Sequence, residues 1–142
     1  MIGSDSPEPI ILERMGMLAG AVAVGAGAAL GAWLRWALSA WLNPYLPKLP
    51  LGTLASNLIG GYLVGFAVAY FAQRHDLPPE ARLFAITGCL GGLTTFSTFS
   101  AEVTQMLLAG EYWAGALIAF THLTGSIVLT IAGIATFRAL AG

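Results

Sequence analysis

The fold is decided by the segment GCLGGLTTFSTFS at residues 88–100, which lies in a stretch without formal charge that covers residues 83–101. A helix of about 20 apolar residues, each rising about 1.5 Å, crosses the hydrocarbon layer of a membrane. Glycines and consecutive β-branched threonines are poor formers of a helix interior. We therefore predict a membrane helix that is broken near residues 91–95. The alternative is a continuous helix whose hydroxyls bond to the preceding turn.

The composition of the whole chain is that of a membrane protein. Apolar residues make up 57% of the 142 residues and charged residues only 9%, against roughly 25% charged residues in soluble domains. So few charges cannot form a water-facing surface. The net charge of −1 provides no basic field for nucleic acid. Cys89 has no partner in its own chain for a disulfide or a thiol metal site.

Four stretches pass the length test, and segments rich in proline, glycine and charge separate them. We predict a single transmembrane domain over residues 1–142, with spans at approximately 15–41, 50–73, 82–109 and 112–138. Residues 1–13 are predicted to be a short, poorly ordered polar tail, because they are acidic where a secretory signal is basic. An even number of spans places both termini on one side of the membrane.

Small residues recur four positions apart in these spans, a spacing that lets membrane helices approach closely. The pairs are Gly16 with Gly20, Gly27 with Gly31, Gly61 with Gly65, and Gly88 with Gly92. They predict a compact bundle. Because four short spans enclose no generous pore, we also expect the chain to form an oligomer.

Polar side chains on the second span and aromatic rings on the third are candidates for function, because polar groups in lipid are costly unless partnered. Thr53 and Asn57 share a helix face, and the Asn57 amide can replace part of an anion's hydration shell or join two helices. Phe96 and Phe99 also share a face. Their ring edges carry partial positive charge and suit an anion, although such rings are more often lipid-facing or core residues.

Three further polar positions remain open on the sequence alone. On the fourth span, His122, Ser126 and Thr130 form a stripe that lines an ion path or bonds to its own helix. Arg35 extends to the membrane surface or supplies positive potential at a pore mouth. Glu102 receives no role, because an acidic group is awkward for anion permeation.

Three motifs together resemble the Fluc family of fluoride channels, also called CrcB. They are Gly31-Ala-Trp-Leu-Arg35, Gly52-Thr-Leu-Ala-Ser-Asn57 and Gly91-Gly-Leu-Thr-Thr-Phe-Ser-Thr-Phe-Ser-Ala-Glu102. The resemblance extends through all four spans in order. It implies an all-α membrane protein with a broken third helix, which forms an antiparallel, dual-topology homodimer with two separate fluoride pathways. It also implies a bacterial inner membrane.

Carried onto this sequence, the resemblance implies roles for individual residues. A structural Na⁺ at the centre of the dimer is held by the backbone carbonyls of Gly91 and Thr94. Arg35 matches a basic residue near the aqueous vestibule, and His122 stands where we expect a serine. With Thr53 added from its place beside Asn57, the predicted fluoride pathway consists of Asn57, Phe96, Phe99, Ser97, Thr98, Ser126 and Thr53.

The function expected from these residues is passive, fluoride-selective conduction that exports F⁻ and protects the cell. One rival is a proton-coupled small-solute exporter, for which Glu102 and His122 are the only intramembrane coupling candidates. A second rival is a membrane assembly subunit that transports nothing. An enzyme is not expected, because one histidine and one glutamate within the spans form no recognisable set of nucleophile, base and orienting group.

Overall fold

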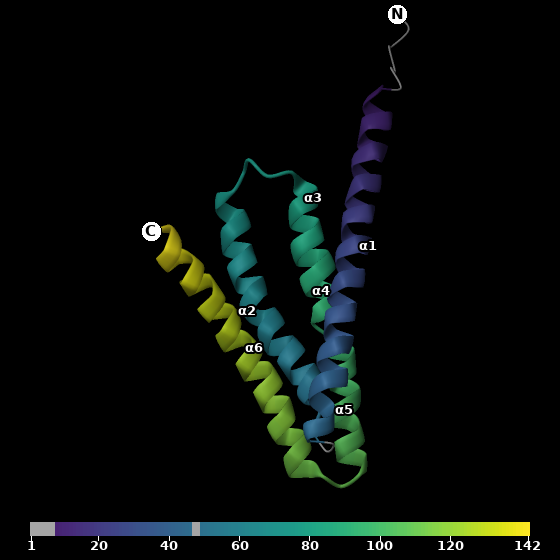
Figure 1. Ribbon diagram of the computed structural model, residues 1–142, viewed down its shortest axis with the longest axis vertical. Coiled ribbons are helices and arrows are strands. Elements are labelled where there is room, and N and C mark those ends of the chain that lie inside the picture. Colours follow the sequence, from purple (N-terminus) through teal and green to yellow (C-terminus); the bar gives the residue numbers. More distant parts are fainter. Residues whose placement is uncertain (1–7, 47–48) are drawn as a thin grey trace, which may run out of the picture.

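The computed structural model describes residues 8–46 and 49–142, which are helical apart from short connections (Figure 1). The elements are α1 (Glu8–Leu42), η1 (Asn43–Tyr45), α2 (Leu51–Gln73), α3 (Pro79–Arg82), η2 (Leu83–Leu90), α4 (Gly91–Leu93), α5 (Phe96–Leu108) and α6 (Tyr112–Ala141). Within the described residues, four segments are long and apolar enough to cross a membrane: Ile11–Tyr45, Leu51–Gln73, Pro79–Leu108 and Tyr112–Ala141. The prediction of an all-α protein with four membrane-capable segments is confirmed.

The first helix begins earlier than the sequence suggested. Residues 8–13, predicted as part of a poorly ordered tail, belong to α1, which starts at Glu8. Pro9 is tolerated there because the first turn of a helix has no intrahelical partner for its N–H groups, so the missing proline N–H costs nothing. The predicted tail therefore extends a helix from residue 8 on, and residues 1–7 lie outside the described part of the chain.

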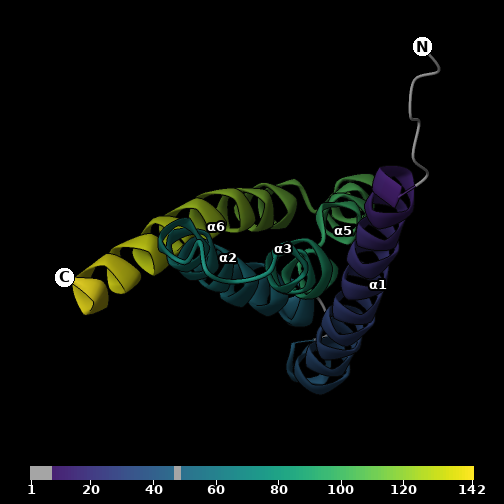
Figure 2. The ribbon, with the colours of Figure 1, turned by 90° about the horizontal axis from the view of Figure 1, so that it is seen from above.

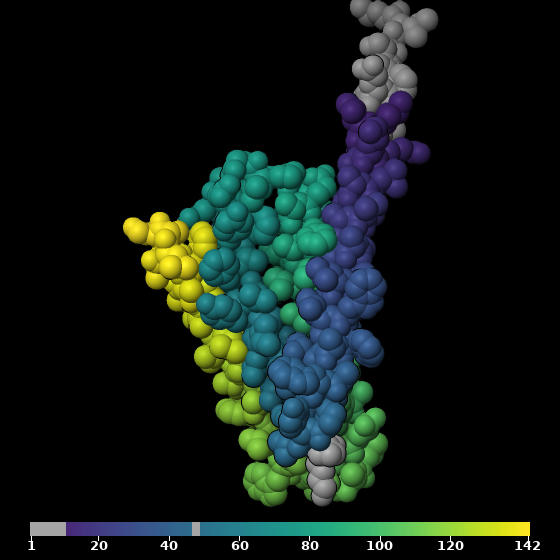
Figure 3. Space-filling view, in the orientation of Figure 1, coloured from purple at the N-terminus to yellow at the C-terminus, as the bar shows by residue number. Residues whose placement is uncertain are grey.

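The helices form a bundle in which the third membrane-capable segment, α3 to α5, lies between α1 and α6 (Figure 2). Helix α2 packs along α6, and α1 packs along η2 and α4. The start of α1 and the end of α6 lie at the same end of the molecule (Figure 1). At that end the N-terminal part of α1 projects beyond its neighbours (Figure 3).

Glycines let these helix pairs meet backbone to backbone. A Cβ atom on Gly88 would lie 2.8 Å from the Val24 carbonyl oxygen of α1, and one on Gly61 would lie 3.0 Å from the Ser126 carbonyl oxygen of α6. A Cβ on Gly65 would collide with the Thr130 carbonyl. By contrast, Gly16, on the projecting part of α1, has nothing within 4 Å of such an atom. Close packing without a hydrophobic driving force requires such small residues in lipid.

The link between α5 and α6 is a tight turn that needs a glycine. Gly110 has φ of 78°, a left-handed conformation that costs glycine least. The Glu111 N–H donates to the Met106 carbonyl at 2.9 Å, and the Gly110 N–H donates to the Leu107 carbonyl at 3.1 Å. These two bonds satisfy carbonyls at the end of α5, as in a Schellman motif.

The connection between α2 and α3 carries an exposed ion pair. Arg74 donates from Nε and Nη2 to the two carboxylate oxygens of Asp76, each at 2.8 Å. These hydrogen bonds lower the pKa of Asp76 to about 2. The pair therefore stays charged at neutral pH, which suits a loop at the membrane surface.

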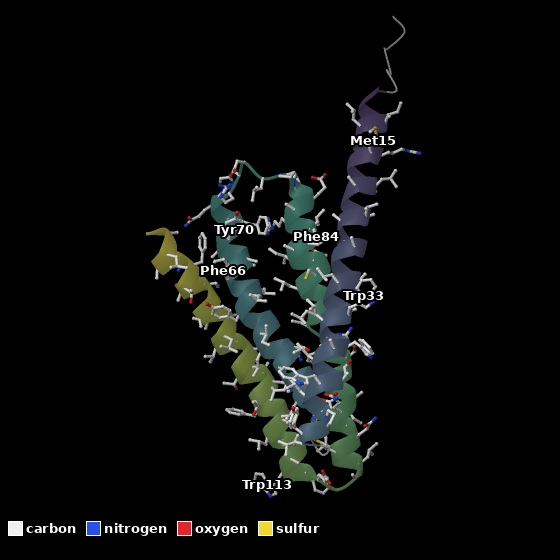
Figure 4. All side chains as sticks on the ribbon, in the orientation of Figure 1. Met15, Trp33, Phe66, Tyr70, Phe84 and Trp113 are labelled. Carbon is white, nitrogen blue, oxygen red and sulfur yellow. The ribbon has the colours of Figure 1, made fainter. Side chains whose placement is uncertain are left out.

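Large apolar side chains cover the outside of the bundle. Trp33 on α1 is 69% exposed, and Trp113, at the start of α6, is 91% exposed (Figure 4). Between α2 and α6, Phe66 and Phe137 pack edge to face with ring centroids 5.4 Å apart. So extensive an apolar surface is foreign to soluble monomers and is suited to lipid or to a further subunit.

Candidate functional site

The regular backbone of the third segment is interrupted at two threonines. Helix α4 ends at Leu93 and α5 begins at Phe96, and Thr94 and Thr95 have extended backbones with ψ of 151° and 116°. Thr95 caps the following helix, because its Oγ1 accepts the Thr98 N–H at 3.2 Å. We call Thr94 and Thr95 the interruption.

The interruption removes the usual helical donors of several carbonyls, among them those of Gly91 and Thr94. In a continuous helix the N–H of each residue donates to the carbonyl four positions earlier, so Thr95 would serve Gly91 and Thr98 would serve Thr94. Here the Thr95 N–H donates instead to Asn57 Oδ1 at 2.8 Å, and the Thr98 N–H donates to Thr95 Oγ1. The carbonyls of Gly91 and Thr94 are thus left without their helical donors.

Asn57, on α2, binds both backbone groups of Thr95. Its Oδ1 accepts the Thr95 N–H, and its Nδ2 donates to the Thr95 carbonyl at 3.1 Å. The same Nδ2 lies 3.1 Å from His122 Nδ1 on α6. One amide therefore connects α2, the interruption and α6.

Three aromatic rings adjoin this connection. Phe99 stacks on His122 with ring centroids 4.5 Å apart and an interplanar angle of 23°. Phe96 meets Phe99 at 5.5 Å and 65°. His122 is only 3% exposed, whereas Phe96 is 77% exposed. The rings thus run from the buried amide network to the surface of the chain.

A groove of about 360 Å³ passes over these residues. It combines apolar walls with a few polar groups, as ligand sites usually do. Four of the predicted pathway residues, Asn57, Phe96, Phe99 and Ser126, line it. The remaining lining residues are Gly61, Val64, Thr94, Thr95, His122, Leu123, Ile127 and Thr130.

The other predicted pathway residues are placed in two separate groups. The hydroxyls of Ser97 and Thr98 gather on Thr95 Oγ1, at 3.3 and 3.1 Å, and do not line the groove. Thr53 donates to Glu102 Oε1 at 2.6 Å. Glu102 also lines a second groove of about 330 Å³ near the α5–α6 turn.

Arg35 lies beside the interruption. Its Nε donates to the Gly92 carbonyl at 3.1 Å, and the side chain is half-buried. The Phe96 N–H would serve that carbonyl in a continuous helix, so the arginine replaces a lost donor. The contact falls well inside the third membrane-capable segment rather than at its end. An arginine that extended to the membrane surface would not make this contact.

Sequence reasoning missed Thr95 as the centre of the network and left Glu102 without a partner. The cap could have been found, since a threonine three residues before Thr98 and directly before a helix is a usual capping residue. The Asn57–Thr95, Thr53–Glu102 and Arg35–Gly92 contacts join separate helices, and a single sequence carries no signal for them.

Comparison with known proteins gives the family of this chain. A family profile described as "CrcB-like protein, Camphor Resistance (CrcB)" matches residues 22–134. A protein named "Fluoride-specific ion channel FluC" from Nitrosospira multiformis is 66% identical over 84% of this chain and 93% of its own length. Proteins of the same name from Thiobacillus denitrificans, 60% identical over 84% of this chain and 96% of their length, and from Cupriavidus metallidurans, 62% identical over 86% and 97%, are also similar. The chain therefore belongs to the CrcB family.

Proposed function

We propose that this chain is a passive, fluoride-selective ion channel that exports F⁻ and protects the cell from it. The observation that carries the proposal is that relatives 60% to 66% identical over most of the chain are named fluoride-specific ion channels. The four membrane-capable helices agree with that name. We place the channel, a multi-pass membrane protein, in the inner membrane of a bacterium.

The conducting pathway must replace the water that fluoride loses. A bare anion in an apolar interior is very costly, so polar groups have to take over its hydration. Ser126 lines the groove with a hydroxyl, and Ser97 and Thr98 extend the polar groups along α5. Asn57 and Thr53 would serve the ion by exchanging their present bonds to Thr95, His122 and Glu102. Each is a modest donor, which suits conduction because an ion must also leave every site.

Phe96 and Phe99 contribute ring edges to the same pathway. The hydrogens at the edge of an aromatic ring carry partial positive charge and attract an anion. The two rings are inclined at 65°, so their edges face different directions along the groove. Tight spacing between rings and donors favours fluoride over the larger chloride.

We further propose that two copies insert in opposite orientations and form an antiparallel homodimer. The support is the exposed apolar surface around the groove, including Phe96, which a second copy would cover. The dimer would contain two fluoride pathways. The interruption would then act as a break in the membrane-embedded third span, buried by protein, because irregular backbone is not tolerated against lipid.

A structural Na⁺ at the centre of this dimer fits the backbone of the interruption. The carbonyls of Gly91 and Thr94 have lost their helical donors to Asn57 and Thr95, and oxygen ligands suit a hard cation. Two such carbonyls from each copy would hold the ion, whose role is to fix the two interruptions against each other. Arg35, on the neighbouring Gly92 carbonyl, adds positive potential toward the vestibule.

The proposal is tested by reconstituting the purified protein into liposomes loaded with fluoride or chloride. An ion-selective electrode then follows efflux after a conductive ionophore relieves the membrane potential. We expect rapid fluoride efflux and no chloride efflux. Equal rates for the two anions would refute the selectivity, and no efflux of either would favour a non-transporting assembly subunit.

Phe96 and Phe120 form a matched pair for the same assay. Both rings are largely exposed, 77% and 67%, but only Phe96 lines the groove. Phe96→Ala should therefore reduce fluoride efflux strongly, and Phe120→Ala should leave it near the parent rate. Similar losses in both variants would show that exposed rings matter for assembly in general rather than for the pathway.

A further inference from the structure

The orientation of the Asn57 amide is fixed by backbone groups that cannot change role. The Thr95 N–H can only donate, so the Asn57 atom 2.8 Å away must be the oxygen. The Thr95 carbonyl can only accept, so the atom 3.1 Å from it must be the amide nitrogen. A flipped amide would place its N–H groups against the Thr95 N–H and its oxygen against the Thr95 carbonyl, so donor would face donor and acceptor would face acceptor. Nδ2 of Asn57 is therefore the atom that faces His122.

That orientation determines the tautomer of His122. Because Asn57 Nδ2 is a donor, the His122 Nδ1 atom 3.1 Å away has to accept. A neutral imidazole that accepts at Nδ1 carries its proton on Nε2. The doubly protonated ring has a proton on each nitrogen and would set the Nδ1–H against the Asn57 N–H. The contact thus selects the neutral ring with the proton on Nε2.

The Nε2–H selected in this way is a buried donor that still needs an acceptor. Nε2 is buried and has no hydrogen-bond partner among the described residues. His122 is only 3% exposed, and it lines the groove together with Ser126 and Phe99. Phe99 stacks on the ring face and holds its plane. A buried donor without an acceptor is unfavourable, so this N–H indicates a ligand.

We infer that His122 donates its Nε2–H to the fluoride ion in the groove, while its Nδ1 accepts from Asn57 and keeps the donor in place. The inference deepens the proposed function and depends on it. A neutral donor suits a conducting pathway better than a charged one, because it binds the ion without trapping it. Both N–H groups of Asn57 are held by the Thr95 carbonyl and by His122 Nδ1, so the donor offered to the anion comes from His122.

The tautomer and its response to fluoride can be measured by nitrogen-15 NMR of histidine-labelled protein in lipid. The chain has two histidines, and His75 lies in the exposed α2–α3 connection. His75→Gln therefore leaves a single labelled ring without altering the groove. We expect a bare Nδ1 and a protonated Nε2 at neutral pH, and a shift of the Nε2 resonance as fluoride is added. Chloride should leave that resonance in place.

Two substitutions separate the donor from the support that the ring gives to Asn57. His122→Asn keeps an acceptor where Nδ1 lies but has no group at the position of Nε2. His122→Gln reaches the position of Nε2 with an amide donor but lacks the acceptor for Asn57. A lost hydrogen bond to an ion corresponds to a roughly tenfold or larger rise in the half-saturating fluoride concentration. We expect that rise in His122→Asn and a smaller one in His122→Gln.

A larger rise in the half-saturating fluoride concentration for His122→Gln than for His122→Asn would overturn the inference. It would show that His122 acts only by supporting Asn57. A proton on Nδ1, or an Nε2 resonance that fluoride does not move while the parent protein conducts fluoride, would overturn it as well. The NMR measurements leave position 122 intact, so they test the inference even if a variant at position 122 does not fold. Absence of fluoride efflux from the parent protein would instead refute the proposed function itself.

Discussion

The third segment and α6 contain the same kinds of residues, yet only the third segment is interrupted. In α6, Thr121, Thr130 and Thr136 each donate to the carbonyl four residues earlier, at 2.8 to 2.9 Å, and the helix runs unbroken for 30 residues. In the third segment, Thr94 makes the same bond to Leu90, but the backbone leaves the helix at that same residue. Hydroxyl groups alone therefore do not break a membrane helix.

The two segments differ in whether side chains of other helices bond to the backbone N–H and carbonyl groups that a break leaves unpaired. The Thr95 N–H donates to Asn57 Oδ1, and the Thr95 carbonyl accepts from Asn57 Nδ2. Arg35 replaces the missing donor at the Gly92 carbonyl. No threonine of α6 has a comparable amide opposite its backbone in the described contacts, although Thr130 also donates to Gly61 of α2. Two side chains from other helices stabilise the interruption, because unsatisfied backbone groups are costly in lipid.

Removing the amide should give the largest effect. Asn57→Ala leaves the Thr95 N–H and carbonyl without partners, at a cost of roughly 2 to 6 kcal/mol. We expect fluoride efflux from liposomes to fall to background. Asn57→Asp, which keeps an acceptor for the Thr95 N–H, should retain more folded protein in size-exclusion chromatography than Asn57→Ala. Normal efflux from Asn57→Ala would mean that the interruption does not depend on α2.

The packing of α6 against α2 can be tested next. Gly65→Ala places a Cβ against the Thr130 carbonyl and should lower the free energy of unfolding by about 1 to 3 kcal/mol through overpacking. Gly16→Ala is the matched control, because nothing lies within 4 Å of its Cβ. We expect that control to be neutral or stabilising in thermal unfolding in detergent. Equal losses of unfolding free energy in both variants would show that the destabilisation does not come from the close approach of two helices.

The cap at the interruption should have a smaller effect. Thr95→Val keeps the shape of the side chain but removes the acceptor for the Thr98 N–H, which costs about 1 kcal/mol for a typical cap. Thr136→Val in α6 removes a hydroxyl that bonds only to its own helix. Its effect on thermal unfolding should stay within about 0.5 kcal/mol. A larger loss in α6 than at Thr95 would contradict the contrast drawn between the two helices.

The smallest effect is expected at Glu102, whose carboxylate accepts from Thr53 outside the interruption. Glu102→Gln keeps an oxygen that can accept the same hydroxyl. Fluoride efflux should stay within about fivefold of the parent rate, equivalent to about 1 kcal/mol. Complete loss of transport, together with coupling of fluoride to a proton gradient, would favour the proton-coupled exporter over the passive channel.

The sequence predicted the membrane-capable helices because long apolar runs bounded by prolines and charges have few other solutions. The glycine pairs on the spans likewise predicted close helix contacts, which hold at Gly61, Gly65 and Gly88 but not at Gly16. The start of α1 was misplaced because acidic residues and prolines resemble a tail, although both are compatible with the first turn of a helix.

The candidate site was less accessible from the sequence. Its residue types were predicted, and Asn57, Phe96, Phe99 and Ser126 do line one groove. Their partners were not, since Asn57 and Thr95 are 38 positions apart and Asn57 and His122 are 65 apart. Hydrogen bonds between helices depend on rotation and depth, which composition does not encode. The roles predicted for these residues in fluoride conduction stay predictions.

The projecting start of α1 has a consequence for the surrounding bilayer. A helix of 35 residues is about 52 Å long, well beyond the roughly 30 Å of hydrocarbon. Its outer turns carry apolar side chains such as Met17 and Leu18, which are 71% and 67% exposed. A helix whose apolar surface exceeds the hydrocarbon thickness relieves the mismatch by tilting, and that tilt changes with acyl-chain length. Since Arg35 on the same helix contacts the Gly92 carbonyl, a change in the tilt of α1 would act on the interruption.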